Sequence, residues 1–199
     1  MLAPNVTTRL SEKEKAMVLH ELDRQICFEV SERFAIVPAP APDAGTVRTV
    51  ITRLRSASRA ASAASAVGGF FVPIPVAKFR VPFTTGGLAI ESELLAPGGK
   101  QASALIWTKN VGAIGRIKPS LSRAGDAIQL SEPLGDAVGK TFASKSRSKI
   151  EIGEADPCAR FGPRTNIART LAIGAVGFGT GLYMPQVAGT SVKKEEQDD

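Results

Sequence analysis

Two alternating segments joined by a glycine turn constrain the fold of this chain more than any other feature. Residues 88–95 and 101–109 have the composition of β-strands, and Pro97-Gly98-Gly99-Lys100 separates them. A glycine pair between such segments is typical of an antiparallel hairpin. With Gly98 and Gly99 at the centre of the turn, the partners expected on one face are Ile90 with Trp107 and Ser92 with Leu105.

A capping signal predicts the first helix. Ser11 and Glu14 have the S-x-x-E spacing with which a helix start satisfies its free backbone N–H groups. Apolar residues then recur every three or four positions, at Leu19, Leu22, Ile26 and Val30. We expect a helix over residues 11–33 and a short strand over residues 34–37, closed by prolines that cannot donate to a strand ladder.

The rest of the chain predicts one further strand and two helical regions. Residues 46–55 are rich in β-branched side chains and alternate, which indicates a strand. Residues 56–66 are mainly Ser and Ala, so they form either a helix or a low-complexity link, ended by Gly68-Gly69. Helical spacing returns over residues 128–142, where we expect Pro133 to break the helix in two.

These elements predict an α/β (α+β) fold, a compact sandwich of a mixed, largely antiparallel sheet of four or five strands with two to three helices. Hydrophobic residues form 43% of the 199-residue chain, enough for a packed core. We expect a single domain over residues 1–150, a Gly/Pro-rich C-terminal extension over 151–192 and a disordered charged tail over 193–199.

Three stretches in this order resemble a known family: the first helix leading into FAIV, then VRTVITRLR, then GGLAIESELL with its turn and returning strand. Together they are similar to bacterial proteins, predicted to be lipoproteins, that are grouped as domain of unknown function 3313. The resemblance covers residues 12–145. It implies a place in the cell envelope, on the periplasmic side and peripheral to the outer membrane, and it brings no established reaction.

The start of the sequence differs from that family. Its members begin with a signal peptide and a lipidated cysteine, whereas residues 1–5 here lack a basic segment followed by an apolar one, and no cysteine lies early enough for lipidation. We therefore expect a reading frame that starts too late or a processed form. Localisation in the envelope follows from the resemblance alone.

The charge distribution predicts a basic middle. The chain carries a net charge of +6, and residues 46–90 hold six basic and no acidic side chains. Such a segment suits nucleic acid, anionic lipid or an anionic polymer, but an ordinary solvated face explains it as well. We do not expect nucleic acid as a partner, since no module with clustered cations and interleaved aromatic residues is present.

The residues offer little for catalysis. His20 and Cys27 lie seven positions apart on the first helix, about 10 Å along its axis, too far for a nucleophile and its base. One His and two separate Cys give no metal-ligand spacing, so we expect no catalytic residues, no metal and no cofactor. Whether Cys27 and Cys158 form a disulfide stays open, because Cys27 is expected inside a helix and Cys158 on an exposed turn.

Two places are candidate contact sites. Glu91 and Glu93 share one strand face and are a candidate ligand contact, although a half-buried strand also turns carboxylates to solvent. Residues 70–83 hold four of the nine Phe together with three prolines, which argues against a central strand. This segment either covers the core, docks a partner or second copy, or enters a membrane surface, where Lys78 and Arg80 would suit anionic lipid. The candidate interaction surface comprises Phe70, Phe71, Ile74, Phe79 and Phe83.

We therefore expect a non-catalytic accessory or binding domain of the cell envelope. Its partners would be an envelope protein or a second copy, with peripheral membrane contact as a further option. Two alternatives belong to other classes. One is an enzyme that acts on an anionic envelope polymer through Glu91 and Glu93, and the other is a basic cytoplasmic protein that contacts nucleic acid.

Overall fold

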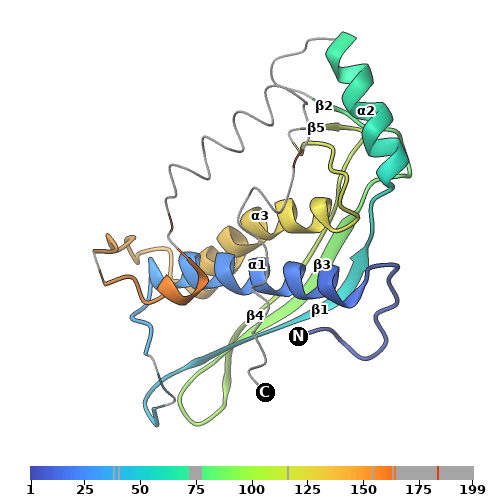
Figure 1. Ribbon diagram of the computed structural model, residues 1–199. Helices are drawn as coiled ribbons and strands as arrows, with labels where there is room; N and C mark the ends of the chain where they lie inside the picture. Colours follow the sequence, from blue (N-terminus) through green and yellow to red (C-terminus); the bar gives the residue numbers. More distant parts are fainter. Residues whose placement is uncertain are drawn as a thin grey trace, which may run out of the picture.

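The computed structural model describes residues 1–37, 39, 41–71, 78–115, 117–153, 155–162, 164 and 183, with the backbone alone at 68–71 and 78–79. Helices α1 (Glu12–Ser31) and α3 (Gly125–Phe142) lie side by side across one face of a sheet (Figure 1). Helix α2 (Arg59–Phe71) lies at one end of the sheet. This arrangement confirms the predicted α/β class.

Three antiparallel strands form the main sheet in the order β1–β3–β4. They are β1 (Thr46–Arg55), β3 (Gly87–Leu95) and β4 (Gln101–Asn110). The predicted register is confirmed, since Ile90 pairs with Trp107 and Ser92 with Leu105. Gly98 and Gly99 both have a φ of 84°, a conformation that glycine adopts without steric cost.

The beginning of the chain adds a parallel bridge to β1 and makes the sheet mixed. Leu2 pairs with Ile51, with the Ala3 N–H donating to the Ile51 carbonyl and the Ile51 N–H donating to the Met1 carbonyl, both at 2.9 Å. A second, two-stranded sheet joins β2 (Lys78–Phe79) to β5 (Ile114–Gly115). The five named strands thus divide between two sheets.

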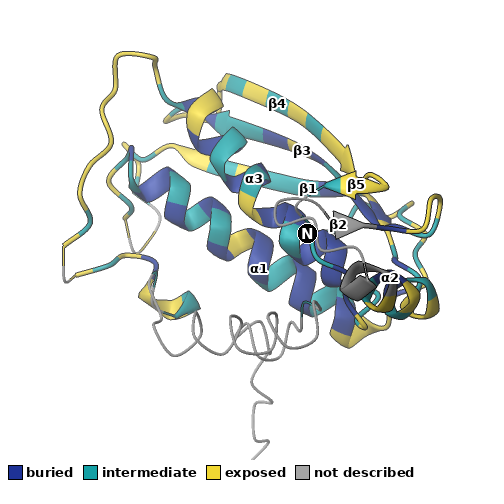
Figure 2. Ribbon diagram, turned by 90° about the horizontal axis from the view of Figure 1, so that it is seen from above, coloured by how far each residue is buried: buried dark blue, intermediate teal, exposed yellow. Residues whose placement is uncertain are grey.

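One face of the main sheet is covered and the other is open. Ile51 of β1 and Leu88 and Ile90 of β3 are completely buried beneath the helices. The opposite face is more exposed, as Figure 2 shows most plainly along β4, where Ile106 is 79% exposed. The core therefore lies between the sheet and the α1–α3 layer.

The α1 helix begins where the sequence predicts. The Ser11 side chain accepts a hydrogen bond from the Glu14 N–H, and the Glu14 carboxylate accepts one from the Ser11 N–H at 3.0 Å. Burial alone would raise the pKa of Glu14, but the Ser11 hydrogen bonds and the charges of Arg59 and Arg123 outweigh it. The pKa of this carboxyl is therefore held below its usual value.

Close packing against α1 keeps α3 continuous, so the predicted break at Pro133 is wrong. Gly135 and Gly139 face α1 so closely that an added Cβ would lie 2.8 Å from the Gln25 carbonyl oxygen and 2.9 Å from the Glu29 carbonyl oxygen. Residues on both sides of the proline are completely buried. This packing outweighs the cost of the proline inside the helix.

Two other local predictions are corrected. Residues 34–37 form no strand, because no described strand pairs with them. The glycine pair at 68–69 does not end α2, which continues to Phe71. Two glycines cost about 2 kcal/mol of helix propensity, which the surrounding Ala-rich helix tolerates. Among the described residues, no helix is both long and apolar enough to cross a membrane.

Candidate binding pocket

An open pocket of about 790 Å³ lies between α1, the start of β1 and the segment that connects them. We call it the α1–β1 pocket. Its size is that of pockets that hold small molecules. Apolar side chains supply much of the wall, including Ile26 and Val30 from α1, Val47 from β1 and Leu94 from β3. The helical spacing of Ile26 and Val30 places both on the face of α1 that looks toward the sheet.

The connecting segment forms a second wall. Phe34, Ile36 and Val37, expected to form a strand, line the pocket instead. The guanidinium of Arg147 lies 4.6 Å from the centre of the Phe34 ring, and its Nη1 donates to the Arg33 carbonyl at 3.1 Å. A segment that follows α3 therefore supports this wall from outside.

A short 3-10 helix, η1 (Ala159–Phe161), supplies Arg160 and Phe161 to the pocket. The Phe161 ring lies edge-on to the His20 ring of α1, with centroids 5.7 Å apart. The residue before η1, Cys158, is bonded to Cys27, which also lines the pocket. The sequence had left this pairing open.

The disulfide links a partly exposed cysteine to a fully buried one. Cys158 has 0% exposure, so the expectation of an exposed Cys158 is wrong. The carboxylate of Asp156 folds the turn by accepting the Cys158 N–H at 2.9 Å, and this directs the sulfur toward α1. Cys27 lies in the middle of α1, away from its ends, and this does not prevent the disulfide, because the side chain of a helical residue projects outward from the helix axis.

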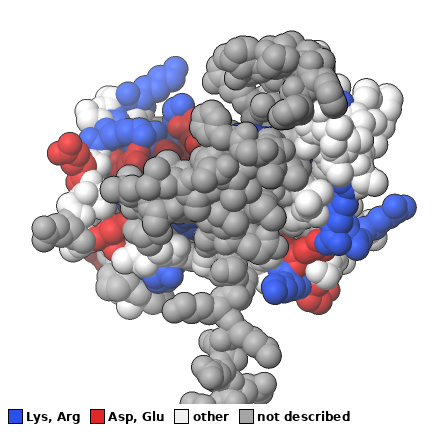
Figure 3. All heavy atoms as spheres, turned by 45° about the horizontal axis from the view of Figure 1, so that its top comes forward, with Lys and Arg blue, Asp and Glu red and all other residues white. Residues whose placement is uncertain are grey.

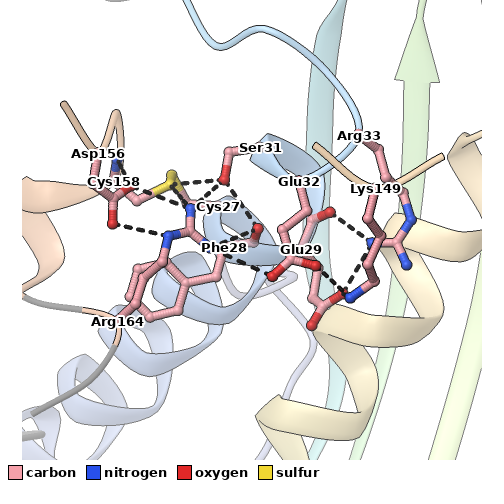
Figure 4. A network of polar contacts seen from close by, with 10 residues as sticks. All are labelled: Cys27, Phe28, Glu29, Ser31, Glu32, Arg33, Lys149, Asp156, Cys158 and Arg164. Carbon is pink, nitrogen blue, oxygen red and sulfur yellow. Dashed lines mark hydrogen bonds and ion pairs between the residues drawn. A yellow bond between two sulfur atoms is a disulfide. The ribbon is translucent and has the colours of Figure 1, made fainter. Parts of the chain in front are cut away.

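Charged residues join the segment after α3 to the end of α1 (Figure 4). Arg164 donates through Nε to Asp156 Oδ2 at 2.9 Å and through Nη1 to the Phe28 carbonyl at 3.1 Å. Lys149 pairs with Glu32 and lies 3.8 Å from Glu29. The hydrogen bond to Glu32 raises the pKa of the Lys149 ammonium group.

Asp23 is the acidic group that α1 contributes to the pocket. Its side chain is open to solvent, yet the protein atoms around the pocket raise the pKa of its carboxyl above the usual value. The charges of the Met1 ammonium group, His20 and Arg160 act in the opposite direction and do not cancel this effect. The wall also carries a second acid, Asp43, and one cation, Arg160, among its apolar side chains. A pocket with such a wall can hold a small, mainly apolar molecule in a fixed orientation.

The predicted carboxylate pair lies away from this pocket. Glu91 and Glu93 project from the open face of the main sheet, Glu91 opposite Val50 and Glu93 opposite Arg48. Glu93 accepts a hydrogen bond from Gln101 at 3.0 Å and lies 3.9 Å from the Arg48 guanidinium. Their ligand role stays a prediction.

The phenylalanine surface is described only at one end. Phe83 is 93% exposed, with a φ of 63°. Ile74 and the side chains of Phe70, Phe71 and Phe79 lie outside the described residues.

Arg80, expected near anionic lipid, is instead buried. Its guanidinium makes a two-point ion pair with Asp126, at 3.0 Å to each carboxylate oxygen. The suggestion that it meets lipid is therefore wrong. The reason is the complementary carboxylate that α3 brings to the same place.

Three described arginines of the basic middle of the sequence pair with acids: Arg48, Arg59 and Arg80. Arg53 donates to the Thr108 hydroxyl and Arg55 to the Phe83 carbonyl. Figure 3 likewise shows basic and acidic side chains interspersed around the face that it draws. Among the described residues, no cluster of three or more His, Cys, Asp or Glu is arranged to hold a metal ion.

Sequence reasoning did not find the α1–β1 pocket. Its walls come from four separate parts of the chain, and none carries a recognisable motif. The only signal was the presence of two cysteines, one within the first helix and one beyond the predicted domain.

Comparison with known proteins identifies one family. The family described as Protein of unknown function (DUF3313) matches residues 2–138, more than half of the chain. The match contains α1, the main sheet and most of α3. No curated protein matches the chain, and no solved structure matches it.

Proposed function

We propose a binding function for this chain, which belongs to the DUF3313 family of proteins of unknown function. In this proposal it is a non-catalytic binding domain of the bacterial cell envelope, on the periplasmic side. It holds a small, mainly apolar molecule in the α1–β1 pocket. The observation that carries the proposal is this pocket, with the wall that the Cys27–Cys158 disulfide ties in place.

The disulfide supports the location. Disulfides persist in oxidising compartments, including the bacterial periplasm, and are rare in a reducing cytosol. The bonded cysteines lie 131 positions apart in the sequence, so oxidation fixes η1 against α1 from far along the chain. An oxidising compartment would thus complete the pocket.

The lining supports the ligand class. Burial of apolar surface contributes roughly 25 cal/mol per Å², so a mainly apolar molecule gains affinity from Ile26, Val30, Phe34 and Leu94. Asp23 and Arg160 would orient any polar end of the ligand. A neutral or weakly polar molecule fits this wall better than an anionic one, because the lining holds two acids, Asp23 and Asp43, against one cation, Arg160.

Binding of a neutral apolar fluorophore, N-phenyl-1-naphthylamine, tests the pocket. Ala44 lines the pocket, and Ala44→Trp places a large side chain inside it. We expect at least tenfold weaker fluorophore binding to this variant. The matched control is Ala104→Trp on the exposed face of β4, which should bind as the unmodified chain does. Equal binding by both variants would contradict the proposed site.

Fractionation of the native host tests the location. The protein should appear in the envelope fraction, with both cysteines resistant to alkylation until a reductant is added. Recovery from the cytosol with two free thiols would contradict the proposal.

A further inference from the structure

We propose that the Cys27–Cys158 disulfide is exchange-active: a small thiol that enters the α1–β1 pocket attacks Cys27, and Cys158 leaves as a thiolate received by Arg164 and Ser31. The reversible product carries the small thiol on Cys27 as a mixed disulfide. This activity does not depend on the pocket's apolar ligand. It needs only the pocket as an entrance.

Exposure determines which sulfur is attacked. Cys27 is partly exposed and lines the pocket, whereas Cys158 has 0% exposure. A small thiol can therefore reach Cys27 from the pocket while the segment after α3 covers Cys158. The pocket's dimensions favour a small thiol, such as cysteine or glutathione, over a thiol fixed on a folded protein.

The environment of Cys158 suits a leaving thiolate (Figure 4). Arg164 Nη2 lies 3.7 Å from Cys158 Sγ, and Ser31 Oγ lies 3.6 Å from the same sulfur. A disulfide sulfur is neutral and accepts hydrogen bonds weakly, so these contacts contribute little before exchange. They strengthen when negative charge develops on Cys158, because hydrogen bonds to charged acceptors are the stronger kind.

The donors are in place before the reaction. Asp156 and the Phe28 carbonyl hold Arg164 at 2.9 and 3.1 Å, and its guanidinium lies 4.6 Å from the centre of the Phe28 ring. The Ser31 hydroxyl now donates to the Phe28 carbonyl at 2.9 Å, and a rotation about one bond can turn its hydrogen toward the thiolate. Arg164 Nη2 also contacts Ser31, so both donors meet beside the sulfur.

The step balances without an external oxidant. The small thiol first loses its proton to solvent, and its thiolate forms a new bond to Cys27 Sγ. The Cys27–Cys158 bond breaks, and its electron pair remains on Cys158. Attack by the Cys158 thiolate on Cys27 reverses the step and expels the small thiol. A faster forward step follows from a better stabilised leaving thiolate.

Exchange with glutathione tests the proposal on the full oxidised chain. After acid quenching and alkylation of free thiols, peptide mass spectrometry should find glutathione on Cys27 and the alkyl group on Cys158. Removing the cation with Arg164→Gln should slow the exchange about three- to tenfold, since a nearby opposite charge shifts a thiol by one or more pKa units and the rate follows part of that shift.

Arg147→Gln is the matched control. Arg147 also attaches the segment after α3 to the end of α1, but it contacts Arg33 and Phe34 and not the sulfur. Its loss should leave the exchange rate unchanged or slightly higher. A purely structural Arg164 predicts the opposite sign to ours, because loosening the segment would expose the disulfide and accelerate its reduction.

Three results would overturn the proposal: faster or unchanged exchange in Arg164→Gln, glutathione found on Cys158, or reduction by a thioredoxin-type dithiol protein with no reaction with glutathione. If Arg164→Gln does not fold, Ser31→Ala carries the same comparison and should also slow exchange. The fluorophore assay separates this proposal from the proposed function. Absent fluorophore binding with intact exchange at Cys27 would refute only the proposed ligand.

Discussion

Replacing Asp126 with asparagine tests how far one buried ion pair stabilises this fold. Asp126 lies in the first turn of α3 with 0% exposure, and the Arg80 side chain is 2% exposed. The carboxylate accepts both guanidinium contacts of Arg80 at 3.0 Å and the backbone N–H of Gly86 at 2.6 Å. It thereby joins the region around β2 and the start of β3 to α3.

The expected loss is large because the substitution leaves a buried cation without its counter-charge. The asparagine side chain would keep an acceptor for the Gly86 N–H, but its amide NH2 would face the other guanidinium nitrogen of Arg80, so the change removes both the counter-charge and one acceptor. The remaining contacts of Arg80 are at the limit of hydrogen bonding, 3.4 Å to the Lys118 carbonyl and 3.5 Å to Ser62. Removing one partner of a buried pair costs about 3–5 kcal/mol, a large share of the roughly 5–15 kcal/mol that stabilises a typical domain.

Urea unfolding followed by circular dichroism, with a thermal melt, measures this loss. For a chain of this size we expect Asp126→Asn to lower the melting temperature by about 6–20 °C. The matched control is Asp136→Asn in the same helix, which breaks the exposed Asp136–Lys140 pair. That change should cost less than about 0.5 kcal/mol.

A loss below about 1 kcal/mol for Asp126→Asn, or a loss equal to that of the control, would refute the reasoning. If Asp126→Asn does not fold, Arg80→Lys provides the measurement. It keeps the positive charge but loses the two-point geometry, and should cost about 1–3 kcal/mol.

Three further predictions concern other parts of the fold. Gly135→Ala should cost about 1–3 kcal/mol in urea unfolding, because its Cβ would lie 2.8 Å from α1 backbone atoms, whereas Gly153→Ala, with nothing within 4 Å, should be neutral. Glu14→Gln keeps the capping-box hydrogen bond but removes the negative charge at the start of α1, and should cost about 0.3–1 kcal/mol at pH 7. Ionised Glu14 stabilises the fold above its unfolded pKa, so this cost should disappear as pH falls through its lowered folded pKa, which unfolding at pH 7 and pH 3 would detect. Cys158→Ser should lower the free energy of unfolding by roughly 2–5 kcal/mol relative to the oxidised unmodified chain. With a reductant present, both chains lack the disulfide and should have the same free energy of unfolding, so an equal loss in both conditions would contradict the prediction.

Local patterns predicted the elements whose causes are local. The capping box placed the start of α1, and the glycine pair at 98–99 placed the hairpin with its register. Each depends on residues that are close in the sequence, three positions apart for the capping box and fewer than twenty for the predicted hairpin pairs. The strand over residues 46–55 was likewise predicted with its observed bounds.

Long-range packing explains what the sequence could not predict. Pro133 breaks isolated helices, but α1 packs closely against the helix just after it, at Gly135 and Gly139. Arg80 and Asp126 lie 46 positions apart, and only the fold shows that they are partners. A basic residue among aromatic side chains therefore suggested a lipid contact where the fold places a buried ion pair.

The α1–β1 pocket could not be predicted from the sequence either, because residues far apart in the chain form its walls. Some of these residues lie outside the region that matches the family. Residues 2–138 match DUF3313 and supply the walls from α1, β1 and β3. Arg160 and Phe161 lie outside that match, and they are held against the matched region by the Cys27–Cys158 disulfide together with the contacts of Arg164 to Phe28 and Ser31. The complete pocket therefore depends on a covalent bond and on polar contacts that join the family region to the segment after it. A change that breaks both should remove one wall and leave the sheet and its two covering helices in place.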